Sequence, residues 1–264
     1  MSYRFAVAHD RRDLASGFVL RSAPGHPAFP VRLAQELFLR SVAGLPEGRP
    51  LTLWDPCCGS GYLASVLGFL HRSSLAQVVC SDVSAAAVTL ARGNLALLTN
   101  HGLAEREREL RARAATYGKP GYVEAADAAR RLAQELQAAG GDLPSVTAVA
   151  DVFDPAALAA LPAADLVITD VPYGQQTSWQ GAAPPGDEAL PALLRALCQV
   201  LPEHAIVALC ARDRRISFGR PVPALARLRV GHRAAFLGRV ADIKAAQAGR
   251  ATGPGDRKWA NSPP

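Results

Sequence analysis

Residues 51–64 read LTLWDPCCGSGYLA, and this stretch decides the fold of the chain. An apolar run ends in Asp55, passes through a turn that contains Gly59 and Gly61, and continues in a helix-like pattern. Glycine permits the positive φ angles of a tight turn and removes the side chain where a ligand approaches the backbone. The order of strand, glycine turn and helix is typical of the first unit of a nucleotide-binding α/β fold.

The acid at the strand end distinguishes this turn from one that binds a pyrophosphate. Ala64 stands at the third glycine position of the G-x-G-x-x-G pattern, and Asp55 would repel a phosphate but attract an ammonium group. The run resembles the first motif of S-adenosylmethionine (SAM)-dependent methyltransferases, in which D-P-x-C-G-S-G is common among enzymes that modify nucleobase nitrogens. The resemblance implies SAM as the cofactor and assigns Asp55, Cys57, Gly59 and Gly61 to its binding.

A second motif, VITDVPYG at residues 167–174, is again an apolar strand followed by an acid. It resembles the (N/D)-P-P-(Y/F/W) signature of methyltransferases that act on planar nitrogens, although Val171 stands where that signature usually has its first proline. Methylation of a base nitrogen needs an acceptor for the N–H and a flat surface for the ring, which Asp170 and Tyr173 would provide. The motif predicts Asp170, Pro172 and Tyr173 as catalytic residues, with a loop at Val171 that is looser or differently hydrogen-bonded.

Two further acids follow predicted strands between these motifs. Asp82 comes 21 residues after the glycine turn, near the spacing at which nucleotide-binding folds hold a ribose. It is alternatively part of the helix cap at Ser84. Asp151 follows the next strand and matches the acid that accepts from the adenine amino group in SAM enzymes, although Asp154 is near enough to compete. We therefore expect Asp82 and Asp151 to contact the cofactor.

Apolar runs and helical patterns alternate along the chain, which predicts an α/β fold. The resemblance specifies it as the Rossmann-like fold of class I methyltransferases: a mostly parallel seven-stranded sheet with an antiparallel C-terminal hairpin and helices on both faces. The predicted strands lie at 51–54, 77–81, 145–150, 165–169, 205–211, 226–230 and 235–240, with a short extra strand at 17–20. SAM should lie across the carboxyl ends of strands one, two and four.

The length of 264 residues fits one catalytic domain with additions. We expect the methyltransferase domain at 49–248, after an N-terminal extension at 1–48 whose helix packs near the cofactor. A charged helical insertion at about 103–143 is most simply an exposed, salt-bridged helix, and alternatively helps to hold the substrate. A flexible tail is expected at 249–264.

Composition bounds the setting in which the chain acts. No apolar run approaches the ~18–20 residues of a membrane span, and the N-terminus lacks the apolar core of a signal peptide. The five cysteines are odd in number and fall in predicted core elements, so we expect them to be reduced and structural. The histidines are scattered, and no residue is assigned to a metal. These features predict a cytoplasmic protein.

Positive charge gathers near the C-terminus. Residues 211–264 carry twelve basic and three acidic side chains, against a net charge of +6 for the whole chain. Clustered cations are the electrostatic signature of phosphate-backbone binding, although a solvated basic face is the alternative. A polar loop at 174–187 follows the catalytic motif and can close over a flipped base. The predicted substrate contacts are Trp179, Arg212, Arg214 and Arg215.

Over most of its length the chain also resembles the avilamycin-resistance ribosomal RNA methyltransferases, through the Asp-Val-Pro-Tyr variant, the long insertion and the basic C-terminal part. This resemblance implies methyl transfer to N1 of a guanine in large-subunit rRNA, with resistance to an orthosomycin antibiotic. It also implies a monomer whose partner is the rRNA or the ribosomal large subunit. Guanine N1 carries a proton, so Asp170 would act as the base. The alternatives are a DNA adenine or cytosine amino methyltransferase, a protein or small-molecule methyltransferase, and a non-enzymatic RNA-binding scaffold.

Overall fold

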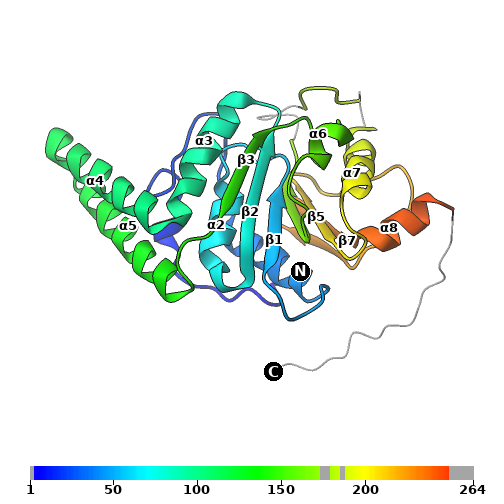
Figure 1. Ribbon diagram of the computed structural model, residues 1–264, viewed down its shortest axis with the longest axis horizontal. Coiled ribbons are helices and arrows are strands. Elements are labelled where there is room, and N and C mark those ends of the chain that lie inside the picture. Colours follow the sequence, from blue (N-terminus) through cyan, green and yellow to red (C-terminus); the bar gives the residue numbers. More distant parts are fainter. Residues whose placement is uncertain (1–2, 173–178, 185–187, 250–264) are drawn as a thin grey trace.

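The computed structural model describes residues 3–172, 179–184 and 188–249. Its centre is a seven-stranded sheet in the order β3-β2-β1-β4-β5-β7-β6 (Figure 1). The first five strands in this order, from β3 through β2, β1 and β4 to β5, run parallel, whereas β7 is antiparallel to both β5 and β6. The strands are β1 (Leu51–Asp55), β2 (Leu75–Asp82), β3 (Ser145–Val149), β4 (Leu166–Asp170), β5 (Ile206–Ala211), β6 (Ala226–Val230) and β7 (Arg233–Arg239). The predicted fold class is confirmed, including the antiparallel hairpin.

Successive residues of the strands point into two separate cores. Leu53 and Val78 pack in one core, whereas their neighbours Trp54 and Val79 pack in the other. This alternation follows from the two-residue period of a strand, and it requires helices on both faces. The first core includes residues of α1 (Val31–Val42), α2 (Tyr62–Leu70) and α3 (Ala85–Leu95), and the second those of α6 (Pro155–Ala159), α7 (Ala189–Val200) and α8 (Val240–Gln247).

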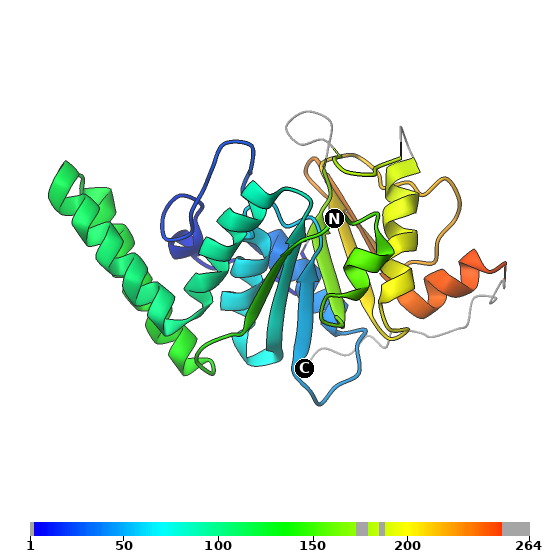
Figure 2. The same ribbon diagram turned by 45° about the horizontal axis from the view of Figure 1, so that its top comes forward.

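The insertion is a helical hairpin of α4 (Asn100–Tyr117) and α5 (Pro120–Ala138). It projects from the β3 end of the sheet as an arm (Figures 1 and 2). Ion pairs line its surface, such as Arg113–Glu109 at 2.9 Å. Arg106 is an exception, because it is buried and donates to the carbonyl of Val19 at 2.9 Å. The insertion is therefore two helices, and one arginine of its charged run ties it to the N-terminal segment.

Three described elements differ from the sequence expectation: the strand at 17–20, and the helices α6 and α8, neither of which was predicted. The strand expected at 17–20 is absent, because the chain turns at Gly17 (φ 81°) and only an isolated bridge joins Ser16 to Leu20. The carbonyls of Phe18 and Val19 accept from Arg106 instead of from a neighbouring strand. Conversely, α8 was not predicted; it is a short helix that buries Val240 and Ile243.

Some expectations concern residues outside the described part of the chain. Tyr173, most of the loop at 174–187 and all but Gly249 of the tail at 249–264 belong to this group. The five cysteines are all described, and none forms a disulfide, as expected. No helix in the described ranges is long and apolar enough to cross a membrane.

Candidate active site

The carboxyl ends of the parallel strands bring the predicted acids together. Asp55, Asp82 and Asp170 are the last residues of β1, β2 and β4, and parallel strands end on the same edge of the sheet. All three line one cleft, which the loop before α1 also borders through His26 and Phe29. The expected meeting of strands one, two and four is therefore observed.

The two glycines of the first turn have different roles. Gly59 (φ +51°) donates its N–H to Asp82 Oδ2 at 2.9 Å, and its missing side chain leaves room for His26, whose Nδ1 would lie 3.0 Å from an added Cβ. Gly61 (φ +69°) does not border the cleft; an added Cβ would lie 3.0 Å from the backbone of Ala91 in α3. Gly59 thus keeps the cleft open, whereas Gly61 lets α2 start close against α3.

Asp55 is the most deeply buried acid of the cleft. Its residue is 2 % exposed, and burial raises its pKa to about 7, with the negative charges of Asp82 and Asp170 adding to the shift. The buried hydroxyl of Thr169 lies beside it and has no hydrogen-bond partner of good geometry among the described residues. A buried carboxyl group whose pKa is strongly raised, at the edge of a cleft, is typical of a functional site.

Asp82 serves the cleft and the local turn at once. One carboxylate oxygen holds the Gly59 N–H, and the other accepts the N–H of Ser84 at 2.9 Å. The cap of α3 is Ser84 itself, whose hydroxyl accepts from Ala87. Asp82 therefore fixes the glycine turn relative to the start of α3, so the two sequence interpretations of this acid are compatible.

Asp151 lines a smaller cavity with Phe153, Pro172 and Trp179, and this cavity adjoins the cleft because both are lined by Asp82 and Pro172. Its carboxylate accepts the N–H groups of Phe153 at 2.9 Å and of Ala182 at 2.7 Å. Trp179 packs edge-on against Phe153 with ring centroids 5.3 Å apart. Trp179 was expected to hold the substrate base, but in this structure it lies at the Asp151 end, where the adenine of a nucleotide cofactor is expected.

Asp170 forms an ion pair that the sequence analysis did not anticipate. Arg233 Nη1 donates to Asp170 Oδ1 at 2.5 Å. Burial raises the pKa of Asp170, and the positive charges of Arg233 and Arg212 oppose that rise. Pro172 lines the cleft beside Asp170. The carboxyl group therefore lies in a half-buried setting in which two guanidinium groups favour its charged form.

Val171 has a structural reason to replace proline. Its N–H donates to the carbonyl of Cys210 at 2.8 Å, which continues the pairing of β4 with β5 by one residue. Proline has no N–H and would lose this bond. Of the two expectations, a looser loop or a differently hydrogen-bonded one, the second describes this position, because the bond anchors the loop at Val171.

The basic residues near the C-terminus fall into two groups. Three of them form hydrogen bonds within the fold. Arg227 donates to the carbonyls of residues 216 and 222, Arg233 to Asp170, and Arg239 to the carbonyl of Gly44. These guanidinium groups are already engaged, which corrects the view of the whole basic region as one phosphate-binding surface. Arg214, Arg215 and Arg229 line a groove of 580 Å³ beside β6, which Arg227 also borders, and their side chains are exposed. Arg212 is also exposed and acts on Asp170.

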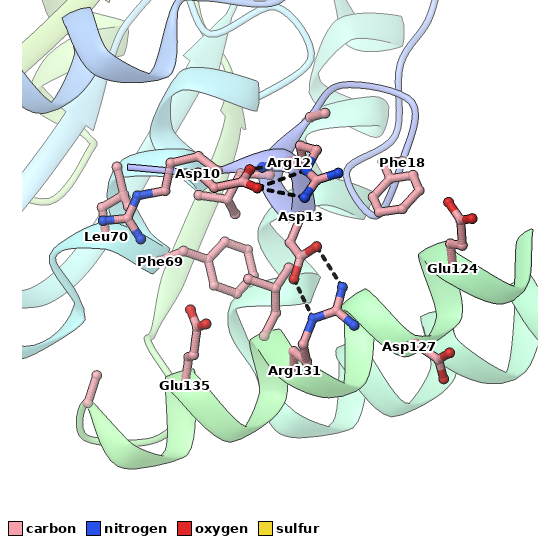
Figure 3. A pocket seen from close by; sticks show the side chains of 15 residues that line it. Asp10, Arg12, Asp13, Phe18, Phe69, Leu70, Glu124, Asp127, Arg131 and Glu135 are labelled. Atoms are coloured by element: carbon pink, nitrogen blue, oxygen red, sulfur yellow. Dashed lines mark hydrogen bonds and ion pairs between the residues drawn. The ribbon is translucent and has the colours of Figure 1, made fainter. Parts of the chain in front are cut away.

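A larger cavity, of 860 Å³, lies elsewhere, between the segment at 10–18, the end of α2 and α5 (Figure 3). Asp13 and Arg131 form a two-bond ion pair across it, at 2.7 and 2.8 Å. Five carboxylates and three arginines line this cavity, so its charge does not suit a polyanion. The cleft at the strand ends is the better candidate for chemistry despite its smaller volume of 150 Å³.

The fold and the cleft together define a class I methyltransferase. The chain belongs to the family of the rRNA methyltransferase AviRa, whose family model matches residues 1–233. It is 54% identical over 246 residues to the 23S rRNA (guanine(2535)-N(1))-methyltransferase of Streptomyces viridochromogenes, covering 92% of this chain and 97% of that protein. Two crystal structures of AviRa from the same organism superpose with TM-scores of 0.86 and 0.87, over 93% of this chain and 99% of theirs.

Sequence reasoning missed His26, which lines the cleft. It also missed Arg233, which pairs with the cleft residue Asp170. Nothing in their local sequence marks these two residues, because His26 reaches the cleft, and Arg233 reaches Asp170, from segments remote in the chain. A pattern of residues along one segment carries no information about such contacts.

Proposed function

We propose that the protein transfers a methyl group from SAM to N1 of a guanine in 23S rRNA, and thereby confers resistance to an orthosomycin antibiotic. We further propose that it acts as a monomer in the cytoplasm, with a catalytic domain at 49–248 that follows an extension at 1–48. The observation that carries the reaction is the half-buried carboxyl group of Asp170 at the end of β4, beside Pro172 in the cleft. Family membership and the relative's activity support the substrate.

The residues of the cleft fit SAM. Asp55 offers a carboxyl group for its ammonium, Asp82 and Asp151 offer acceptors for its hydroxyl and amino groups, and Gly59 leaves the backbone accessible. SAM, when bound, supplies an electrophilic methyl group.

The chemistry assigned to Asp170 is the removal of the N1 proton. Guanine N1 bears a hydrogen, and an ionised carboxylate within hydrogen-bond reach accepts it as the nitrogen lone pair becomes available. Adenine presents a lone pair at N1, which a carboxylate repels. An acceptor at this position therefore favours guanine over adenine, and Pro172 and Tyr173 are proposed to hold the ring.

The direct test is methyl transfer from radiolabelled SAM to 23S rRNA, to assembled large subunits and to DNA, followed by mapping of the labelled base. We expect label at guanine N1 of rRNA or of the subunit, and none in DNA. Label on an exocyclic amino group of DNA would instead favour the DNA amino methyltransferase alternative.

Binding of SAM should depend on pH through Asp55. Its pKa is about 7 in the protein without cofactor, and an ammonium partner lowers it, so binding releases a proton. Below pH 7 we expect the affinity to fall by about tenfold for each pH unit, and above it to level off. Calorimetric titrations between about pH 5.5 and 7 keep the amino group of SAM charged. Asp55→Asn should bind more weakly and lose the slope; an unchanged slope would assign the proton to another group.

Arg214 and Arg215 should contact RNA phosphates. Replacing both by alanine should raise the KM for rRNA and flatten its dependence on salt, because fewer counterions are released on binding. SAM affinity should not change. The matched control is Arg108→Ala with Arg130→Ala, two exposed arginines whose partners are acids of the arm.

A structural role of Arg214 and Arg215 predicts a different outcome. The Arg214 N–H donates to Asp213 close to the end of β5, so these residues could merely shield that strand end. The double variant would then have a lower melting temperature and the salt dependence of the wild type. Measuring both quantities distinguishes contact with RNA from support of the fold.

A further inference from the structure

Arg233 and Asp170 meet across a strand that separates them. Asp170 ends β4, Arg233 begins β7, and β5 lies between, with Cys210 paired to Asp170 on one side and to Ala235 on the other. The guanidinium spans β5 to reach the carboxylate. The side chain of Arg233 is 13% exposed and that of Asp170 is 28% exposed, so the pair is largely shielded from water. A shielded pair of this kind is stronger and less screened than a surface pair.

The guanidinium is held in position by an aromatic ring. Its carbon lies 4.8 Å from the centroid of Phe29, which is 4% exposed and borders the cleft. Arg233 is thus stacked on one side and hydrogen-bonded at its end. This geometry suits the planar, permanently charged group of arginine and does not suit lysine.

The surroundings of Asp170 favour a cation beside it. Burial disfavours the charged form of Asp170. A second acid, Asp55 at the end of β1, is close enough for the two charges to interact. Cys210 on β5 is neutral, because burial raises its pKa to about 12. Among the described residues, the cations that act on Asp170 are Arg233 and Arg212. Arg212 is exposed, so Arg233 is the better shielded of the two.

We propose that Arg233 is the positioning residue for Asp170: it keeps the carboxylate ionised and oriented, ready to accept the proton of the target base. This inference rests on the role proposed for Asp170. It also gives Phe29 and the hairpin of β6 and β7 a part in the reaction, because they position the guanidinium of Arg233. An alternative role in binding phosphate is disfavoured, since turning Arg233 toward RNA would leave a shielded carboxylate unpaired.

The test compares Arg233→Gln, Arg233→Lys and Arg229→Gln by kcat, KM and pH profile on rRNA. In Arg233→Gln we expect kcat to fall by about tenfold or more, and the acidic limb of the kcat profile to move up by about one pH unit, because the pKa of Asp170 rises without its cation. Arg233→Lys should keep the acidic limb in place with a several-fold lower kcat. Arg229→Gln removes an exposed charge from the same hairpin, so it should change KM and leave the limb unmoved.

An unmoved acidic limb in Arg233→Gln, or a rise in KM at unchanged kcat, would overturn the proposal. If Arg233→Gln does not fold, as judged by its melting curve and SAM affinity, Arg233→Lys is used in its place. A lower kcat in Arg233→Lys then supports the proposal, and a higher KM at unchanged kcat overturns it. Asp170→Asn separates this inference from the proposed function. If the Asp170→Asn variant is active, the proposed role of the acid itself is refuted. If Asp170→Asn is inactive but the acidic limb of the pH profile does not move in Arg233→Gln, only the role of Arg233 is refuted.

Discussion

Asp170→Asn should abolish turnover while leaving SAM affinity within a few-fold of the wild type. Asparagine has nearly the same shape and can still accept from Arg233, but it cannot take up the proton of guanine N1. Removal of a general base costs about 10²–10⁴-fold in rate. Single-turnover methylation of rRNA at saturating SAM measures this loss directly, without a contribution from product release.

Asp170→Glu is a useful companion variant, because it keeps the charge but displaces the carboxylate. We expect partial activity, since catalysis depends on the position of the base to within a fraction of a bond length. The melting temperature of each variant should be compared with that of the wild type, because Arg233 loses a charged partner in Asp170→Asn. Near-normal turnover in Asp170→Asn would exclude Asp170 as the base.

Asp82→Ala should weaken SAM binding strongly. The substitution removes acceptors for the ribose hydroxyls and also frees the N–H of Gly59, which Asp82 holds at 2.9 Å. Loss of hydrogen bonds to a charged acceptor costs about 1–3 kcal/mol, or roughly 5- to 150-fold in the dissociation constant. Equilibrium titration with SAM measures the change, and kcat at saturating SAM should change less than the affinity does.

Ser84→Ala is the matched control for this effect. It removes the hydroxyl that caps α3 and should lower the melting temperature, by the equivalent of about 1 kcal/mol, with little change in SAM affinity. If Asp82→Ala behaves like Ser84→Ala, Asp82 is only part of the helix start.

Several features of the fold could be predicted from the sequence because their causes are local. The glycine turn after Asp55 requires positive φ angles, which glycine adopts freely, and the apolar runs at β1, β2 and β4 reflect burial on both faces of a parallel sheet. The short helix α8 was not predicted, since two buried residues in one turn give a weak helical pattern. The expected strand at 17–20 was wrong, because its carbonyls bond to Arg106, a partner 87 residues away.

The sequence by itself determined the class of fold, the order of the motifs and the acids at the strand ends, since each follows from the chemistry and spacing of neighbouring residues. Only the tertiary structure decided which groups those acids meet. Arg233 is paired with Asp170 rather than exposed to RNA, Gly61 faces α3 rather than the cleft, and Trp179 packs on Phe153 near Asp151. The physical reason is that charge, ring and shape complementarity act through space, as between Arg233 and Asp170, which are 63 positions apart in the chain. Periodicity along one segment does not record such contacts.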